Sequence, residues 1–115
     1  MDETPKIVCL IGSTRFATRL HAVARYETLQ MRIVLMPHVF GHSEPAAQAV
    51  EWLAAKPGLD ALHRIKIAMA DEVLFVTEGD YVGAGSRAEV AYARSLGKPV
   101  RFDPPCVAVH FDQEA

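Results

Sequence analysis

Short runs of consecutive apolar residues alternate along this chain with longer segments in which apolar residues recur every three or four positions. The apolar runs occupy residues 6–11, 32–36, 72–76 and 98–102. Runs of this length, rich in Val, Ile and Leu, predict β-strands that are covered on both faces. Pro99 lies near the start of the last run, where an edge strand tolerates proline. The pattern therefore predicts four strands, the last of them at an edge of the sheet.

Apolar residues at helical spacing fill the segments between these strands. The expected helices are residues 15–30, 46–56, 59–70 and 86–96. Pro57 and Gly58 are expected to end the second helix, since proline removes a backbone donor and clashes with the preceding turn. The spacing of the apolar residues in the third helix predicts a buried face made of Leu59, Leu62, Ile65 and Met69.

This alternation of strands and helices predicts an α/β fold in which right-handed crossovers build a parallel sheet with helices on both faces. We expect a single domain over residues 1–115, a flavodoxin-like or Rossmann-like three-layer sandwich with strand order 2-1-3-4. Residues 107–111 are expected either to add a fifth strand or to cover an edge. In a sheet of this order, ligands bind beyond the carboxyl ends of the first and third strands.

Two loops are expected to meet at that place. Gly12, Ser13 and Thr14 follow the first strand, and residues 77–85 follow the third. Each loop leads into a helix N-terminus, whose free N–H groups and positive dipole end favour anions. The loops therefore predict a small anionic or nucleotide-like ligand.

Several side chains near these loops are candidates for binding that ligand. Arg15 and Arg87 begin the two helices, where a guanidinium either pairs with a phosphate or carboxylate or is an ordinary solvated charge. Tyr81 and the pair at residues 39–40 either stack on a base or pack at the rim.

Charge and composition argue against several classes of protein. The chain has 12 basic and 14 acidic residues and a net charge of -2, which does not favour binding to nucleic acid or to an anionic membrane. No apolar run approaches the roughly 20 residues of a membrane-spanning helix, and the acidic start lacks the features of a secretory signal. Two cysteines, Cys9 and Cys106, make no disulfide framework. We therefore expect a cytoplasmic globular protein with reduced thiols.

Glu89 is the sharpest candidate for chemistry, because it lies on the first turn of the expected helix 86–96. Two interpretations stay open for it. Ser86 and Glu89 match a capping box, in which both side chains bond to the backbone; alternatively, the carboxylate faces the crevice and reacts with a ligand.

Two other motifs do not predict a site. Gly83, Gly85 and Ala88 imitate a dinucleotide fingerprint but lie too far beyond the third strand for that motif. His38 and His42 are four residues apart, but the proline and glycine beside them rule out a regular helix that presents both to a metal.

The chain resembles the nucleoside 2-deoxyribosyltransferase-like superfamily, and in particular its small bacterial and phage members. The matching segments are CLIGSTRF at residues 9–16, the loop at 40–42, LHRIKIAMADEV at 62–73 and YVGAGSRAEVAYARSLGKPV at 81–100. Together they span nearly the whole chain.

The resemblance implies a retaining displacement at the anomeric carbon of a nucleoside or nucleoside 5′-monophosphate. In characterised members a glutamate in an E-x-x-x-A helix segment attacks the sugar, and Glu89 matches that position. The base leaves with a proton, and water or a second base resolves the glycosyl-enzyme intermediate. Where those members carry an aspartate before the third strand, this chain has His63. His63, Asp60 or Asp80 is expected to donate the proton to the base.

The resemblance also implies the binding residues and the partners. Those expected to hold the substrate are Gly12, Ser13, Thr14, Arg15, Phe40, His42, Asp80, Tyr81, Gly83, Gly85, Ser86 and Arg87. No metal or organic cofactor is implied. Because family members are commonly dimers or larger, we expect a homodimer or larger homo-oligomer that uses the apolar segment 46–53. The competing hypothesis is a catalytically silent nucleotide-binding module.

Overall fold

The computed structural model describes residues 4–39 and 46–112. Four strands form one fully parallel sheet in the order β2-β1-β3-β4, as predicted. They are β1 (Ile7–Ile11), β2 (Ile33–Leu35), β3 (Glu72–Val76) and β4 (Val100–Asp103). The register places Ile11 beside Phe75, so β1 and β3 end at the same edge of the sheet.

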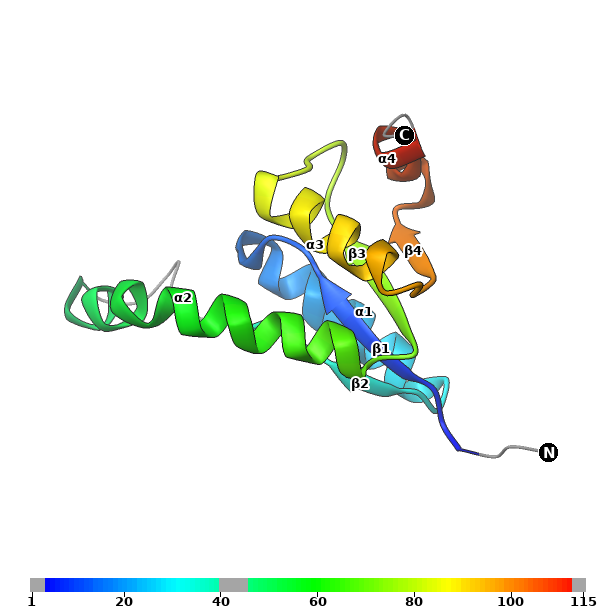
Figure 1. The fold of residues 1–115 in the computed structure, drawn as a ribbon, viewed down its shortest axis with the longest axis horizontal. Helices are drawn as coiled ribbons and strands as arrows, with labels where there is room; N and C mark the ends of the chain where they lie inside the picture. The colour runs from blue at the N-terminus through cyan, green and yellow to red at the C-terminus, as the bar shows by residue number, and fades with distance from the viewer. Residues whose placement is uncertain (1–3, 40–45, 113–115) are drawn as a thin grey trace.

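Helices cover both faces of this sheet (Figure 1). A short 3-10 turn, η1 (Thr14–Phe16), leads into α1 (Ala17–Leu29), and α2 (Ala46–Met69) and α3 (Ala84–Ser95) follow β2 and β3. The chain continues after β4 with the turn η2 (Pro105–Ala108) and the short α4 (Val109–Asp112). This arrangement confirms the three-layer α/β sandwich.

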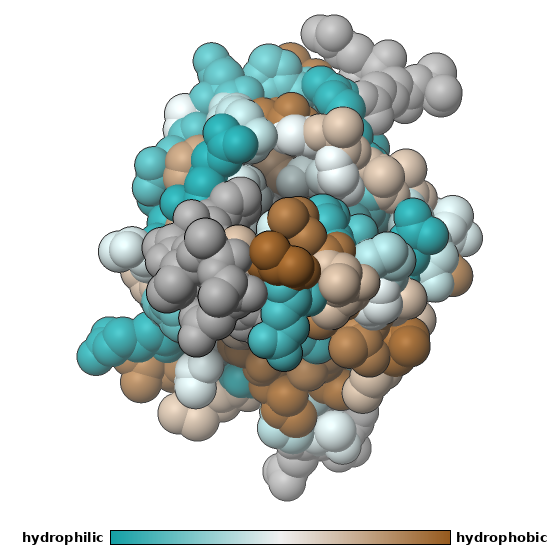
Figure 2. All heavy atoms as spheres, turned by 90° about the vertical axis from the view of Figure 1, so that its left-hand side faces the viewer, coloured by the Kyte–Doolittle hydropathy of each residue, from teal (hydrophilic) through white to brown (hydrophobic). Residues whose placement is uncertain are grey.

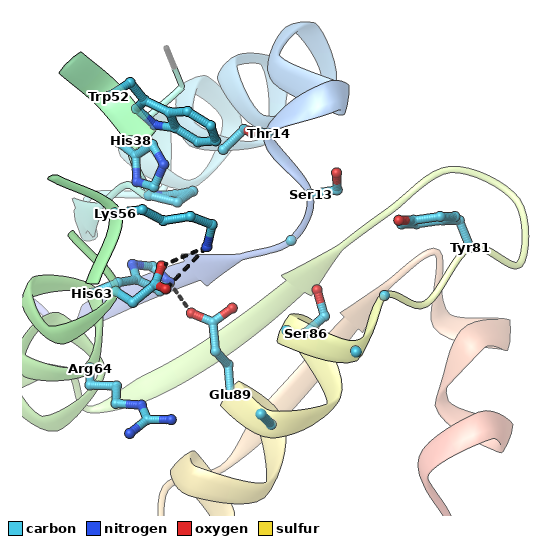
Figure 3. Close-up of a pocket in the computed structure, with 17 residues that line it drawn as sticks. Ser13, Thr14, His38, Trp52, Lys56, His63, Arg64, Tyr81, Ser86 and Glu89 are labelled. Atoms are coloured by element: carbon cyan, nitrogen blue, oxygen red, sulfur yellow. Dashed lines mark hydrogen bonds and ion pairs between the residues drawn. The ribbon is translucent and has the colours of Figure 1, made fainter. Parts of the chain in front are cut away.

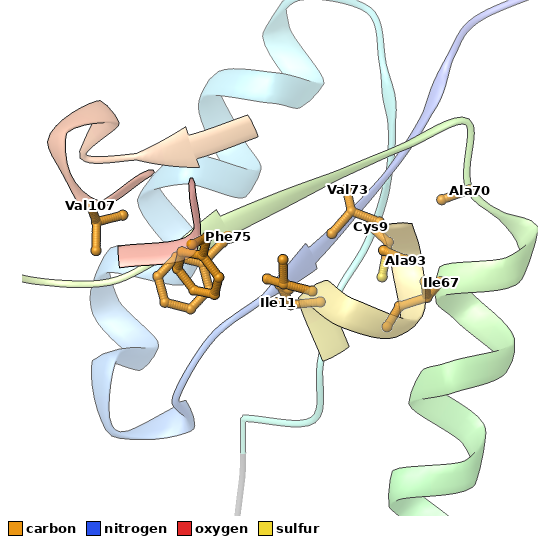
Figure 4. Close-up of a cluster of buried hydrophobic side chains, with 10 residues drawn as sticks. Cys9, Ile11, Ile67, Ala70, Val73, Phe75, Ala93 and Val107 are labelled. Carbon is orange, nitrogen blue, oxygen red and sulfur yellow. The ribbon is translucent and has the colours of Figure 1, made fainter. Parts of the chain in front are cut away.

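Alternate residues of the central strands build two separate cores. Cys9, Ile11, Val73 and Phe75 point to one face and pack against α2, α3 and the segment after β4 (Figure 4). Val8, Leu10, Leu74 and Val76 point to the other face and pack against α1. Because both faces of β1 and β3 are buried, these strands are continuous apolar runs in the sequence.

An ion network around the buried carboxylate of Glu27 ties α1 to β4 at one edge of the sheet. Glu27 on α1 has 2 % of its side chain exposed and contacts Arg32 at 3.1 Å and Arg101 at 2.6 Å. Arg101 also reaches Glu72 at 2.8 Å. With the carboxylate of Glu27 paired in this way, its burial is compensated.

Two predictions about α2 are wrong. A single helix runs through Pro57, where two helices were expected, so the missing backbone donor of proline does not end the helix here. The apolar row expected to be buried is instead exposed: Leu62, Ile65 and Met69 have 55 %, 55 % and 59 % of their surface accessible. The buried side of the same helix carries His63, Ile67 and the adjoining Ala70.

The possible fifth strand is also not present. Residues 105–112 form η2 and α4, and Val107 and Phe111, four positions apart, are both fully buried in the core beside Phe75. A spacing of four places both side chains on one side of a helical segment. It would do the same in a strand, so the spacing alone did not distinguish the two. The segment therefore covers the sheet, as the alternative interpretation expected.

Within the described residues, none of the helices combines the length and apolarity that crossing a membrane would need.

Candidate active site

A cavity of about 380 Å³ opens beyond the carboxyl ends of β1 and β3, between α2 and α3. Figure 3 shows how side chains from both helices and both loops point into it. The residues that line it are Gly12, Ser13, Thr14, Pro37, His38, Trp52, Lys56, Asp60, His63, Arg64, Tyr81, Gly83, Ala84, Gly85, Ser86, Ala88 and Glu89. The site lies at the switch point of the sheet, where the strand order predicts it.

Gly12 brings the two loops together. Its φ of +150° is disfavoured for other residues, and a Cβ built there would lie 2.3 Å from the carbonyl oxygen of Val76 at the end of β3. The next residue, Ser13, caps η1 by accepting a hydrogen bond from the backbone N–H of Arg15 at 3.3 Å. The close approach of backbone at Gly12 therefore forms the floor of the cavity between β1 and β3.

The N-terminus of α3 is open to the cavity. The helix begins at Ala84, and its N-cap, Gly83, makes no side-chain hydrogen bond to the first N–H groups. Ser86 is already inside the first turn and buried, so the capping-box interpretation of Ser86 and Glu89 is wrong. The free N–H groups and the dipole of this helix suit an anionic ligand.

Glu89 and His63 form a contact across the cavity between α3 and α2. The Nε2 atom of His63 lies 2.9 Å from Oε2 of Glu89, and 9 % and 23 % of the two side chains are exposed. Within the described part of the chain, neither ring nitrogen of His63 has an aligned hydrogen-bond partner. Such contacts often tighten only when substrate is bound. A buried imidazole beside a carboxylate is a typical acid, base or nucleophile arrangement.

The continuous α2 carries a row of cavity residues. Trp52, Lys56, Asp60 and His63 follow one another at spacings of four, four and three residues, which places them on one side of the helix. Lys56 pairs with Asp60 at 3.1 Å. The indole of Trp52 lies 6.0 Å, between ring centroids, from His38 in the segment that follows β2.

The electrostatic surroundings lower the pKa of His38. Burial of the imidazole is the main cause, and the positive charge of a protonated His63 adds to it. His38 is therefore less easily protonated than an ordinary histidine, and it presents a neutral aromatic surface with Trp52 at neutral pH.

Tyr81 closes the cavity on the side of the β3 loop. The backbone carbonyl of Tyr81 accepts from Thr77 Oγ1 at 2.7 Å, and its ring packs edge-on against Phe16 with centroids 5.6 Å apart. The guanidinium of Arg15 lies 4.4 Å above the same ring. Arg15 therefore binds the aromatic rim of the site and does not line the cavity itself.

The other predicted binding residues divide into two groups. Asp80 and Arg87 do not line the cavity: Asp80 lies 3.6 Å from His110, and Arg87 donates to the His110 carbonyl at 3.3 Å. Phe40 and His42 lie outside the described residues. The structure brings together the remaining candidates, which are Gly12, Ser13, Thr14, Asp60, His63, Tyr81, Gly83, Gly85, Ser86 and Glu89.

Sequence reasoning missed the site roles of His38, Trp52, Lys56 and Arg64. The spacing of Trp52, Lys56 and Asp60 was the available signal, but the expected helix end at Pro57 separated these residues. In the described ranges, no cluster of three or more His, Cys, Asp or Glu side chains is arranged to hold a metal ion.

The fold of this chain is that of a known enzyme. A 2-deoxyribosyltransferase from the psychrotolerant bacterium Bacillus psychrosaccharolyticus superposes with a TM-score of 0.65 and 17 % identity, over 84 % of this chain and 70 % of that one. The chain shares its fold with this enzyme. That enzyme is described as a biocatalyst for the synthesis of antiviral and antitumoral nucleosides. No protein-family model matches this chain, and no curated protein sequence does. The resemblance seen in the sequence is thus confirmed at the level of the fold.

Proposed function

We propose that the protein cleaves or transfers at the N-glycosidic bond of a nucleoside or nucleoside 5′-monophosphate, with Glu89 as the nucleophile. The observation that carries this proposal is the partly buried carboxylate of Glu89, held against His63 in a cavity at the switch point of the sheet. The fold shared with a 2-deoxyribosyltransferase supports it.

The proposed reaction is a double displacement. A Glu89 oxygen bonds to the anomeric carbon while the bond to the base breaks, and the electron pair goes to the base nitrogen, which takes up a proton. Water then attacks the same carbon, breaks the ester to Glu89 and releases the sugar. When a second base attacks instead, the product is a new nucleoside. Two inversions at one carbon give overall retention of configuration.

The open N-terminus of α3 favours a substrate with an anionic or strongly polar group at the sugar 5′ position. The backbone N–H groups that follow Gly83 lack a side-chain cap, and Ser13 and Tyr81 line the same end of the cavity. A 5′-phosphate placed there would accept hydrogen bonds from these N–H groups. The sugar then lies over Glu89.

The opposite end of the cavity is suited to a base. Trp52 and His38 supply aromatic surface, and Lys56 with Asp60 supplies a donor and an acceptor on the same helix. Planar heteroaromatic rings bind to surfaces of this kind by stacking. In this arrangement Asp60 is engaged by Lys56, so its role is in binding the base edge.

The experiment is a substrate panel with a nucleophile variant. Ribonucleosides, deoxyribonucleosides and their 5′-monophosphates are incubated with protein, with and without a second base, and released or exchanged base is separated by chromatography. We expect Glu89→Gln to lower turnover by at least about 10³-fold, because the amide cannot act as the nucleophile. Glu51→Gln changes an exposed glutamate on α2 and is the matched control.

Binding is measured separately through the fluorescence of Trp52, the one tryptophan in the sequence, which lines the cavity. Glu89→Gln is expected to keep a nucleotide-dependent change in this signal. A fluorescence response without any turnover by the unaltered protein would instead favour the nucleotide-binding module. Equal turnover by Glu89→Gln and by the unaltered protein would rule out Glu89 as the nucleophile.

We also propose that the protein forms a homodimer through the outer side of α2. The exposed apolar residues of this helix are Val50, Leu53, Leu62, Ile65 and Met69. Figure 2, which views the molecule from the end at which α2 projects, shows groups of brown apolar atoms at the surface of that end. A second copy of the chain offers the same apolar row, so two α2 helices related by a two-fold axis would cover each other.

A further inference from the structure

We infer that His63 acts on Glu89 as a positioning residue, and not on the departing base as its proton donor. The inference rests on the proposed glycosidic chemistry at Glu89. Its basis is the contact itself: Nε2 of His63 lies 2.9 Å from Oε2 of Glu89, and 9 % of the histidine side chain is exposed. The imidazole therefore lies beside the nucleophile's own carboxyl group.

The geometry of displacement places the departing base on the other side of the sugar carbon. An attacking oxygen approaches that carbon at about 3 Å, and the bond that breaks extends about 1.5 Å further in line. The departing nitrogen thus lies about 4.5 Å from the attacking oxygen, away from the carboxylate. Nε2 of His63, 2.9 Å from Oε2 of Glu89, lies on the side of the nucleophile, so it does not also reach the departing nitrogen.

A glutamate at this position needs an external group to fix it. Its side chain has three rotatable bonds, and within the described residues the carboxylate has one ion-pair contact, which is with His63 (Figure 3). Because His63 is on α2 and Glu89 on α3, the contact also fixes the carboxylate relative to the helix that carries Trp52 and Lys56. A displacement of about 1 Å in a reacting group can cost about 100-fold in rate.

The other titratable groups near this pair differ in their surroundings. Lys56 is engaged by Asp60, while His38 has a lowered pKa, caused first by burial and then by the charge of His63. The negative charge of Glu89 helps to raise the pKa of the Cys9 thiol, after burial as the larger cause. Because Nε2 of His63 lies 2.9 Å from Oε2 of Glu89, a donor on this ring can stabilise the carboxylate both before attack and when the ester breaks again.

The displacement at the anomeric carbon needs no proton from His63. Glu89 Oε1 bonds to the anomeric carbon, the bond from that carbon to the base breaks, and the base nitrogen receives the electron pair and a proton from water. Hydrolysis of the ester returns the carboxylate to its contact with His63. The proton taken up by the base is replaced by the proton that the attacking water releases.

The test compares a base that needs a proton with one that does not. The substrates are guanine nucleosides and the corresponding 7-methylguanine nucleosides, whose cationic base departs neutral without protonation. The variants are His63→Gln, which keeps an amide donor near the position of Nε2 but cannot transfer a proton, and His63→Leu, which removes the donor. His21→Leu changes an exposed histidine on α1 and is the matched control, and thermal unfolding verifies that every variant is folded.

For a positioning residue, we expect His63→Leu to lower kcat by about 100-fold on both substrates, with His63→Gln within about tenfold of the unaltered protein on both and KM little changed. The inference is overturned when both variants lose about 10² to 10⁴ in kcat on guanine nucleosides but keep kcat on the methylated ones, which is the pattern of a general acid. Turnover of neither substrate by the unaltered protein would instead count against the proposed function, and the positioning role would fall with it.

Discussion

At the scale of single residues, Cys9 and Cys106 provide opposite environments for the same thiol. Cys9 is fully buried in β1 and Cys106 is exposed. Burial, and then the charge of Glu89, raises the pKa of Cys9 to about 12. We expect iodoacetamide near pH 8.5 to add one label to the folded protein and two labels to the denatured protein, because the thiolate is the reactive form. Intact-mass spectrometry counts the labels, and Cys106→Ser should leave the folded protein unlabelled.

The sign of the same pKa shift sets a pH dependence of stability. A thiol with its ordinary pKa near 8.5 loses its proton in the unfolded chain, whereas Cys9 in the folded chain keeps its proton until about pH 12. The unfolded state therefore binds fewer protons in this window, and the contribution of Cys9 to stability falls as pH rises through it. Labelling of Cys9 in the folded protein would show that β1 opens to solvent.

The sequence could place Glu89 and His63 at the candidate site but not the residues opposite them. Glu89 follows a glycine loop and matches a family motif, and both signals are local. The placement of Trp52, Lys56 and His38 depends on whether α2 continues through Pro57 and on where the end of β2 lies beside it. Those are tertiary features, because packing against β1 and α3 holds the buried side of α2 in place.

At the scale of elements, the junction between β1 and β3 depends on Gly12. We expect Gly12→Ala to lower the free energy of unfolding by about 2 kcal/mol or more, because a methyl group would meet the Val76 carbonyl at 2.3 Å and φ would remain at +150°. Chemical denaturation measures the change. Gly58→Ala is the matched control, since nothing lies within 4 Å of its Cβ position and alanine favours a helix.

Comparing Gly12→Ala with Gly58→Ala distinguishes local strain at Gly12 from a general sensitivity to glycine replacement. Gly58→Ala should leave stability unchanged or raise it by up to about 1 kcal/mol. Equal effects of the two substitutions would contradict the role given to Gly12. A relaxed Gly12→Ala protein that stays folded is expected to have displaced loops at residues 12–14 and 77–83, and hence a weaker Trp52 response to nucleotide.

At the scale of the whole molecule, periodicity was sufficient to predict the sheet. The four apolar runs became four parallel strands in the predicted order, because burial on both faces leaves a strong and local signal. The segment after β4 was ambiguous, since Val107 and Phe111 are buried whether it is helical or extended. The prediction for Leu62, Ile65 and Met69 on α2 failed for another reason. An apolar row predicts burial, but no described part of this chain covers these three side chains.

The exposed apolar row on α2 is a candidate interface between two copies of the protein. Isolated exposed apolar residues are ordinary, but Leu62, Ile65 and Met69 lie within two turns of one helix and each has more than half of its surface accessible. The helix has 24 residues and is therefore about 36 Å long, which is enough for two copies to pair along their length. We expect the protein to be a dimer at micromolar concentration.

Ile65→Glu should convert this dimer to a monomer, because pairing would bury two carboxylates near the two-fold axis without partners. Size-exclusion chromatography with light scattering gives the mass directly. Leu29→Glu is the matched control, since Leu29 ends α1 with 54 % of its surface exposed and lies outside the row. A monomeric unaltered protein, or dissociation caused equally by both substitutions, would contradict the interface on α2. Trp52 and Lys56 are on the same helix and line the cavity. Because pairing would hold this part of the cavity wall in place, we also expect loss of the dimer to lower the affinity for nucleotide.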